Sequence, residues 1–251
     1  MASTNDCCAP VAAVRTGRRS WLKRAGAGGG AVVMAGLGLR TEDAEAASLS
    51  QAQRDAMTPD LVIEMMKKGN QRFRSGKMRP QNFLAQKRAS ASGQFPAAVI
   101  LGCIDSRAPA EIILDAGIGD TFNARIAGNI ANKDLMGSLE FACAASGAKV
   151  VLVMGHTACG AIKGAIDNVQ LGNLTGLLEV IKPAVEATAY GGERTSKNPE
   201  FVDAVARTNV LQTIAKLRTG SPVLADLENK GQIKIVGSMY NLADGVLSFM
   251  S

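Results

Sequence analysis

The sequence predicts an α/β protein: a parallel four-stranded sheet core with an added C-terminal strand, flanked by helices. Short apolar runs alternate with stretches of helical periodicity from residue 97 onward, which is typical of a parallel sheet. Two of these runs end directly in side chains that bind metals or exchange protons. Because a parallel sheet places its reactive loops at the carboxyl ends of its strands, we expect both sets of side chains at one edge.

The composition supports this fold class. Of the 251 residues, 47% are hydrophobic and 20% are charged, as in globular proteins. The formal net charge is only +6, and no basic cluster is interleaved with aromatic residues. We therefore expect no nucleic-acid partner.

Residues 1–46 have the features of an export signal. Arg18 and Arg19 form a twin-arginine motif, followed by a glycine-rich apolar run at 25–39 and the small-residue cleavage motif Ala44-Glu45-Ala46. We expect a twin-arginine (Tat) signal peptide, cleavage near Ala47, and a periplasmic or otherwise exported protein. The apolar run is shorter than a membrane span of ~20 residues, so no stable membrane anchor is expected after cleavage. The alternative is a disordered basic tail.

Residues 47–96 predict an N-terminal helical arm and a connector. Thr58 is a good N-cap, and Pro59 follows at the first helical position. The apolar spacing predicts a packing face with Leu61, Met65, Met66 and Phe73. Residues 75–96 are rich in Gly, Ser, Gln and Lys, and predict a connector into the core.

Residues 97–251 predict the catalytic α/β core. Its expected elements are strands at 97–102, 121–126, 150–154 and 232–236, a helix at 136–146, and a polar insert at 188–198 between two helical stretches. The last strand is expected to turn at Asp244-Gly245 into residues 246–249, forming a hairpin.

The first strand leads into Cys103, Asp105 and Arg107, and the third into His156 and Cys159. Two thiols and an imidazole are three protein ligands for zinc, with a fourth position left over. Asp105 could be held by Arg107 in a bidentate ion pair. His156 is the only histidine, and a lone histidine after a strand can also be a hydrogen-bonded polar residue. The additional thiol, carboxylate and guanidinium of Cys103, Asp105 and Arg107 favour the metal site over this alternative.

The cysteines leave a competing hypothesis open. Cleavage would discard Cys7 and Cys8, leaving three cysteines in a compartment that favours disulfides. A redox protein with a Cys103–Cys159 disulfide is therefore possible, although twin-arginine export of a folded chain allows a metal site to form first. Cys143 lies on an apolar helical face and is expected in the core.

Together, Cys103-x-Asp105-x-Arg107 and His156-x-x-Cys159-Gly160 resemble the motifs of the beta-class carbonic anhydrases. The resemblance covers roughly residues 58–250, with supporting matches at 69–73, 125–129, 209–210 and 237–240. It implies the beta-carbonic anhydrase fold, a homodimer or homotetramer, and one Zn²⁺ per chain. The implied reaction is the reversible hydration of CO2 to bicarbonate and a proton by attack of zinc-bound hydroxide.

By this resemblance Cys103, His156 and Cys159 bind zinc, and Asp105 and Arg107 are catalytic. Asp105 is also a possible fourth ligand in a closed state. Ile100 replaces a tryptophan that is usual in bicarbonate-regulated members, which favours the open type of site. The substrate-binding residues implied by the family are Gln94, Phe122, Ala127, Phe141 and Gly160.

Two further functions remain open at this point. A carbonyl sulfide or carbon disulfide hydrolase uses the same fold and ligands. A non-catalytic zinc- or bicarbonate-binding protein is also possible, although a dyad at an open metal position is not needed for binding alone. Because no second histidine exists to carry the product proton, we expect turnover to depend on external buffer.

Overall fold

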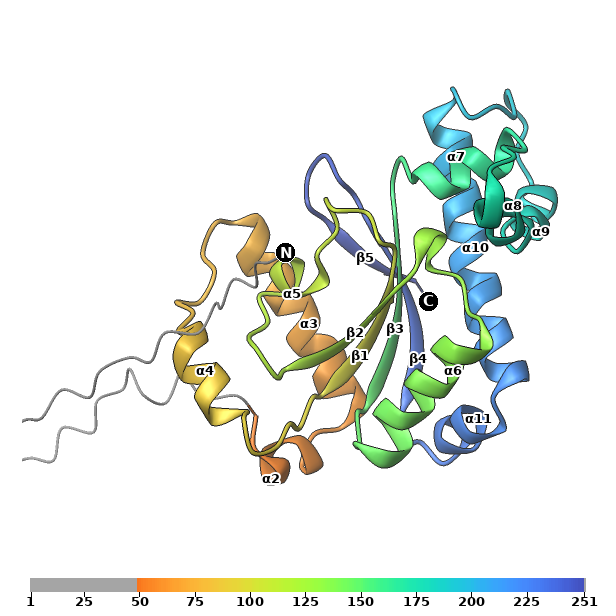
Figure 1. Cartoon of the computed structure of the whole chain (residues 1–251). Helices are drawn as coiled ribbons and strands as arrows, with labels where there is room; N and C mark the ends of the chain where they lie inside the picture. Colours follow the sequence, from red (N-terminus) through yellow and green to blue (C-terminus); the bar gives the residue numbers. More distant parts are fainter. Residues whose placement is uncertain (1–48, 251) are drawn as a thin grey trace, which may run out of the picture. The chain divides into compact units, whose positions relative to one another are not determined.

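The computed structural model describes residues 49–250, so the predicted signal peptide lies outside the described residues. Figure 1 shows one twisted sheet with helices against both faces. The strand order is β2-β1-β3-β4-β5. The strands are β1 (Ala98–Gly102), β2 (Thr121–Arg125), β3 (Val150–His156), β4 (Lys234–Tyr240) and β5 (Leu247–Met250). The first four pair in parallel, and β5 runs antiparallel to β4, which confirms the predicted sheet and its C-terminal hairpin.

The central strands are buried because both faces of the sheet are covered. Every residue of β1 and β3 is buried, as expected for the middle of a parallel sheet. Gly102, the last residue of β1, lies opposite Arg125 of β2 and Met154 of β3. The strand β3 continues past its predicted end to His156, which pairs with Tyr240. The register therefore brings the two predicted motifs to the same edge.

The helices are arranged on two sides of the sheet (Figure 1). One face carries the long helix α10, and its core joins Val99, Leu101, Val151 and Val153 to residues of that helix. The other face carries α3 and α5. The helices are α2 (Gln51–Asp55), α3 (Pro59–Arg74), α4 (Phe83–Ala89), α5 (Ala110–Ile113), α6 (Lys133–Glu140), α7 (Gly160–Ile166), α8 (Gly172–Glu179), α9 (Lys182–Ala187), α10 (Pro199–Gly220) and α11 (Pro222–Asn229), with a 3₁₀ turn η1 (Ala127–Asn129) and a π-helical turn η2 (Phe141–Ala145).

Helix α3 begins where the sequence predicts, and of its predicted packing residues Met66 and Phe73 contact the core whereas Leu61 and Met65 do not. The Thr58 hydroxyl accepts a hydrogen bond from the Leu61 N–H at 3.2 Å, and Pro59 is the first helical residue. The side chains of Leu61 and Met65 are 49% and 38% exposed, which corrects the predicted packing face. The buried residues are Val62, Met66, Gly69 and Asn70.

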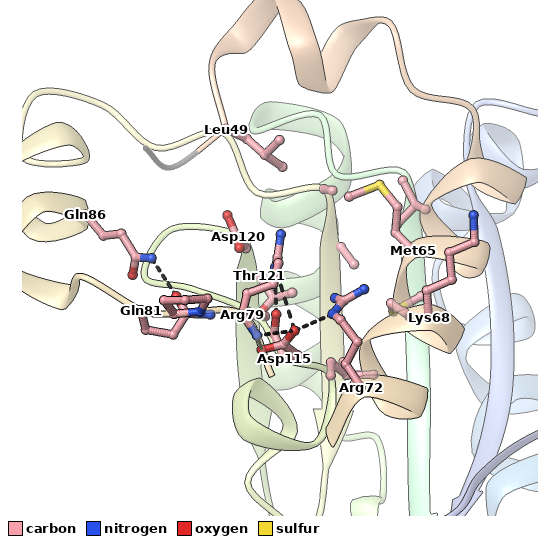
Figure 2. A pocket seen from close by; sticks show the side chains of 17 residues that line it. Leu49, Met65, Lys68, Arg72, Arg79, Gln81, Gln86, Asp115, Asp120 and Thr121 are labelled. Atoms are coloured by element: carbon pink, nitrogen blue, oxygen red, sulfur yellow. Dashed lines mark hydrogen bonds and ion pairs between the residues drawn. The ribbon is translucent and has the colours of Figure 1, made fainter. Parts of the chain in front are cut away.

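An ionic contact joins α3 to the segment between α5 and β2. Asp115 is fully buried and pairs with Arg72 of α3 and with Arg79, as Figure 2 shows. These residues line a cavity of about 220 Å³ that also includes Ala98 and Thr121, the first residues of β1 and β2. The cavity therefore lies at the amino ends of these strands, away from the edge that carries the predicted motifs.

Two predicted segments differ in detail from the structure. The connector at 75–96 contains the short helix α4, whose N-cap Asn82 accepts a hydrogen bond from Ala85. The helix was not predicted because the segment is mostly polar and the helix has only seven residues. The helix predicted at 136–146 begins earlier, after the N-cap Asn132, and ends in the π-helical turn η2. Cys143 lies in this turn and is buried, as predicted.

No helix within residues 49–250 is long and apolar enough to cross a lipid bilayer.

Candidate metal centre

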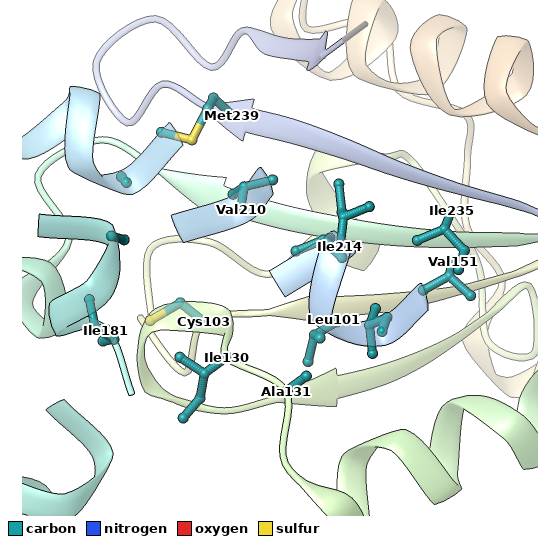
Figure 3. Close-up of a cluster of buried hydrophobic side chains, with 14 of the residues drawn as sticks. Leu101, Cys103, Ile130, Ala131, Val151, Ile181, Val210, Ile214, Ile235 and Met239 are labelled. Carbon is teal, nitrogen blue, oxygen red and sulfur yellow. The ribbon is translucent and has the colours of Figure 1, made fainter. Parts of the chain in front are cut away.

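Three side chains from two loops meet at the carboxyl edge of the sheet. Cys103 follows β1, His156 ends β3, and Cys159 is the N-cap residue of α7. All three are buried, and one candidate ligand atom of each lies within 4.8 Å of the others. Figure 3 shows the Cys103 side chain at the end of the buried cluster that contains Ile130 and Ile181. The structure thus brings the predicted donor atoms together.

The local contacts of His156 leave one ring nitrogen without a partner. Nδ1 lies 2.9 Å from the Thr157 carbonyl oxygen, to which it donates. This contact fixes the tautomer with the lone pair on Nε2. Nε2 is buried and has no hydrogen-bond partner among residues 49–250. A buried acceptor beside two thiols fits a metal ligand, because unpaired buried polar atoms are rare in proteins.

The two thiols lie close together, and each shifts the pKa of the other in the opposite direction. The pKa of Cys103 is lowered to about 4, mainly by its hydrogen bond with Cys159. Burial acts in the opposite direction, and smaller contributions from His156 and from the Gly128 N–H lower the pKa further. The same contact and burial raise the pKa of Cys159 far above its ordinary value. Cysteine binds a metal as the thiolate, so metal binding here would release the remaining thiol proton. The two thiolates are soft ligands that suit zinc.

Gly128 is required at the back of this site. Its N–H lies 3.3 Å from the Cys103 sulfur. The residue has a φ of 70°, and an added Cβ would lie 2.6 Å from a methyl carbon of Ile181. Only glycine combines this left-handed conformation with such a close approach. The N–H···S hydrogen bond stabilises the thiolate form of Cys103.

Asp105 and Arg107 form the predicted ion pair beside the three ligands. Arg107 donates from Nε to Oδ1 at 3.0 Å, from Nη2 to Oδ2 at 2.8 Å, and from its backbone N–H to Oδ1 at 2.9 Å. These side-chain hydrogen bonds hold the pKa of Asp105 well below its usual range. Asp105 Oδ2 lies 3.9 Å from His156 Nε2. The site thus has an ionised hydrogen-bond acceptor next to the donor cluster.

Two residues whose roles the sequence did not reveal hold the first loop. Arg125 donates from Nε to the Cys103 carbonyl at 2.8 Å and from Nη2 to the Asp105 carbonyl at 2.6 Å. Asn209 of α10 donates its amide N–H to the Gly128 carbonyl at 2.7 Å. Both positions lie in runs that carry the family resemblance. Their partners are twenty or more positions away in the sequence, so no local pattern could indicate these contacts.

The predicted substrate-binding residues do not all reach the metal ligands within one chain. Ala127 precedes Gly128, and Gly160 follows Cys159, so both adjoin the site. Phe122 pairs with Val99, four positions before Cys103, and packs edge to face against Phe141 with ring centroids 6.1 Å apart. Gln94 precedes β1, whose five residues span roughly 16 Å, so it lies at the other end of the strand from Cys103.

The chain has clear relatives of known family. The family model for carbonic anhydrase matches residues 98–247. Carbonic anhydrase 2 of Mycobacterium tuberculosis is 35% identical over 191 residues, which cover 74% of this chain and 90% of that protein. The carbonic anhydrase of Mycolicibacterium smegmatis is 32% identical over 195 residues, covering 77% of this chain and 94% of that protein.

Solved structures agree with these relatives. A tetrameric beta-carbonic anhydrase from Sordaria macrospora is 26% identical and covers 64% of this chain and 83% of that chain, with a TM-score of 0.57. A beta-carbonic anhydrase of Aspergillus fumigatus is 28% identical and covers 65% and 79%, also with a TM-score of 0.57. The chain therefore belongs to the carbonic anhydrase family, and within it to the beta class.

Proposed function

We propose that this enzyme hydrates CO2 reversibly to bicarbonate and a proton with one zinc ion per chain, held by Cys103, His156 and Cys159. The observation that carries this proposal is the buried Nε2 of His156, which has no hydrogen-bond partner within residues 49–250, beside the sulfurs of Cys103 and Cys159. When bound, zinc supplies a Lewis acid that makes water a nucleophile near neutral pH. Three protein ligands leave a position for that water, as in catalytic rather than structural zinc sites.

Asp105 and Arg107 set the geometry of the reaction in this proposal. An ionised carboxylate can only accept hydrogen bonds, so Asp105 accepts one from the attacking group and orients its lone pair toward CO2. Anions that carry no proton are disfavoured at the same position. The bidentate contact with Arg107 keeps Asp105 away from the metal position, so we propose the open type of site.

The competing redox function has less support. Cys103, Cys143 and Cys159 are all free thiols in the structure. Moreover, neither a disulfide nor a purely structural zinc site needs a carboxylate and guanidinium pair beside it. Hydrolysis of carbonyl sulfide or carbon disulfide would use the same residues, so it is tested directly in the experiment below.

A homodimer would complete the substrate pocket, either alone or as half of a tetramer. Strand β2 lies at the edge of the sheet and, within residues 49–250, is paired on one side only. A two-fold axis beside β2 reverses the partner's sheet, and so brings the amino end of the partner's strands next to this chain's metal ligands. That end carries Gln94. We propose that Gln94, Phe122 and Phe141 contribute to the site of the second subunit.

We also propose export of the folded protein by the twin-arginine pathway. Support comes from the order of the motif at Arg18 and Arg19, the apolar run and the Ala44-Glu45-Ala46 cleavage motif. Mass spectrometry of the N-terminus of the exported protein should find a start near Ala47. Replacing both arginines by lysine should leave an uncleaved precursor inside the cell; efficient export of that variant would contradict the proposal.

The principal experiment is stopped-flow CO2 hydration by the chain from Ala47, with zinc quantified in the same sample. We expect rapid hydration with about one zinc per chain. Asp105→Ala should keep its zinc and lose most hydration, whereas Asp226→Ala, on an exposed surface ion pair, should behave like the parent. Full zinc with no hydration from neutral to alkaline pH would contradict the proposal, and turnover of carbonyl sulfide would then identify the alternative.

A further inference from the structure

The loop that connects two of the proposed ligands contains a backbone conformation that is unusual for its residue. Only Thr157 and Ala158 lie between His156 and Cys159. Ala158 has a φ of 53°, which lies in the left-handed region that residues other than glycine rarely adopt. This turn ends strand β3 and directs the chain into α7, with Cys159 as the N-cap. The position of the Cys159 sulfur therefore depends on the conformation of Ala158.

Each of the two intervening residues is held by a different element. The Thr157 N–H donates to the Tyr240 carbonyl at 2.9 Å, and its hydroxyl accepts from the Leu242 N–H at 3.0 Å. The Ala158 N–H donates to Oδ1 of Asp203, in α10, at 2.9 Å. Within residues 49–250 the Asp203 carboxylate makes no ion pair and no other hydrogen bond. Its single contact is the one with the strained residue.

We propose that Asp203 is a positioning residue for the metal centre: its carboxylate holds Ala158 in the left-handed conformation and so fixes the distance between the donor atoms of His156 and Cys159. This inference rests on the proposed zinc site. Asp203 does not touch the metal position or the substrate. It acts through the backbone, by accepting an N–H that the loop would otherwise leave without a partner.

Helix α10 also holds the turn η1 (Ala127–Asn129), which contacts the other thiol. Asn209, six residues after Asp203, donates to the Gly128 carbonyl at 2.7 Å, and the Gly128 N–H contacts the Cys103 sulfur at 3.3 Å. The same helix packs on the sheet between these contacts. One helix thus supports the loop before Cys159 directly and the Cys103 sulfur through the turn η1, which is the arrangement expected of a preorganised metal site.

The test compares Asp203→Ala, Asp203→Asn and the double variant Asp203→Ala/Ala158→Gly with the parent, using zinc release to a chromogenic chelator. Loss of an outer contact typically costs about 10- to 100-fold in metal affinity, so Asp203→Ala should release zinc at least ~10-fold faster. Asp203→Asn keeps an oxygen acceptor and should stay within about threefold of the parent. Glycine adopts the left-handed conformation unaided, so the double variant should recover most of the loss.

Two further readouts separate positioning from a general loss of stability. In the cobalt(II)-substituted protein, the thiolate-to-metal absorption bands should shift in Asp203→Ala and return in the double variant. The unfolding midpoint of the metal-free protein should change little in any of them. Asp226→Ala, an exposed aspartate at 59% side-chain exposure, is the matched control and should match the parent throughout.

A dithiol assay keeps this inference independent of zinc. Phenylarsine oxide condenses with two neighbouring thiols, forming two As–S bonds and releasing water, so its capture by the metal-free protein reports whether the Cys103 and Cys159 sulfurs are held together. We expect slower capture in Asp203→Ala and parental capture in the double variant.

Parental zinc release and parental capture in Asp203→Ala would overturn the inference. So would a double variant as impaired as the single one, because the carboxylate charge would then matter rather than the turn. A parent that binds no zinc but shows the expected capture pattern would overturn only the proposed function.

Discussion

His156 is the only histidine in the chain, and the site uses both of its ring nitrogens. Nδ1 donates to the Thr157 carbonyl, and Nε2 is the proposed ligand. Burial raises the pKa of Tyr240, with a smaller contribution from Asp244, so this phenol is a poor proton carrier at neutral pH. The remaining carriers for the product proton are water, carboxylates and dissolved buffer.

We expect the rate of CO2 hydration at saturating CO2 to rise markedly with imidazole concentration, since no side-chain imidazole is free to accept the proton. Stopped-flow rates at constant pH and ionic strength measure this, with zinc content as the control. A rate that stays flat over a wide range of buffer concentration would contradict the prediction and indicate an efficient internal route.

At this scale the sequence predicts the donor side chains but not their supports. Cys103 and His156 are recognisable because one directly follows an apolar strand and the other ends one, and Cys159 because it lies three positions after His156. Asp203 is not recognisable, because its partner Ala158 lies 45 positions away and an aspartate on a helix is ordinarily solvated. For Gln94 the difficulty is a different one. The family resemblance assigns Gln94 to the substrate site, but in this chain it lies at the other end of β1 from Cys103.

Helix α3 approaches the C-terminal end of α5 closely because of one glycine. A Cβ built on Gly69 would lie 1.9 Å from the carbonyl oxygen of Leu114, whereas a Cβ on Gly137 of α6 meets nothing within 4 Å. We expect Gly69→Ala to lower the free energy of unfolding by about 1–3 kcal/mol or more, because backbone must move. Gly137→Ala should raise it by about 0.5–1 kcal/mol, through helix propensity alone. Urea unfolding of both variants measures the difference, and equal midpoints would contradict this account.

An ion pair at the end of α10 makes part of the stability depend on pH. Arg218 donates to both carboxylate oxygens of Glu228 at 2.8 and 2.9 Å. These hydrogen bonds lower the pKa of Glu228, opposed by burial and helped by the Ile235 N–H. A carboxyl with a lower pKa in the folded chain stabilises the fold above its ordinary pKa, and this contribution is lost as the pH falls through the folded value.

We therefore expect Glu228→Gln to lower the free energy of unfolding by about 0.5–1 kcal/mol at neutral pH, a small effect because the pair is partly solvated. The difference from the parent should shrink in acid. Urea unfolding at neutral pH and at a pH below the ordinary range of a glutamate tests this. Glu179→Gln, in an exposed pair with Lys182, is the control. A difference that does not depend on pH would show that packing, not charge, is responsible.

Elements with a strong apolar period are predictable from this sequence, and short or irregular ones are not. The four parallel strands and the start of α3 follow from their apolar runs and from the cap at Thr58. Helix α4 is too short to show a period. The π-helical turn η2 cannot be distinguished from ordinary helix by its composition. The buried face of α3 was predicted only in part, because its closest contact is made by Gly69, which has no side chain to indicate packing.

At the scale of the whole molecule, one chain does not contain a complete version of the proposed site. The metal ligands lie at the carboxyl edge of the sheet, and Gln94 lies beyond the amino end of β1. Phe141 is 55% exposed next to Phe122 on the edge strand β2, where an exposed aromatic side chain is available to a second copy. These residues can act on one substrate only if two chains combine.

Mixing two inactive variants tests this arrangement. In a heterodimer of Asp105→Ala with Gln94→Ala, both substitutions fall in one site if Gln94 serves the partner, and the other site is intact. Equal mixing gives half heterodimers, so we expect about a quarter of the parental hydration rate after subunit exchange. Asp105→Ala mixed with His156→Ala is the matched control: each substitution damages its own chain's site, and no activity should return. If the first mixture stays as inactive as its components while native mass spectrometry shows that heterodimers form, Gln94 does not act across the interface. Recovery in the first mixture alone requires that the two chains share their catalytic sites.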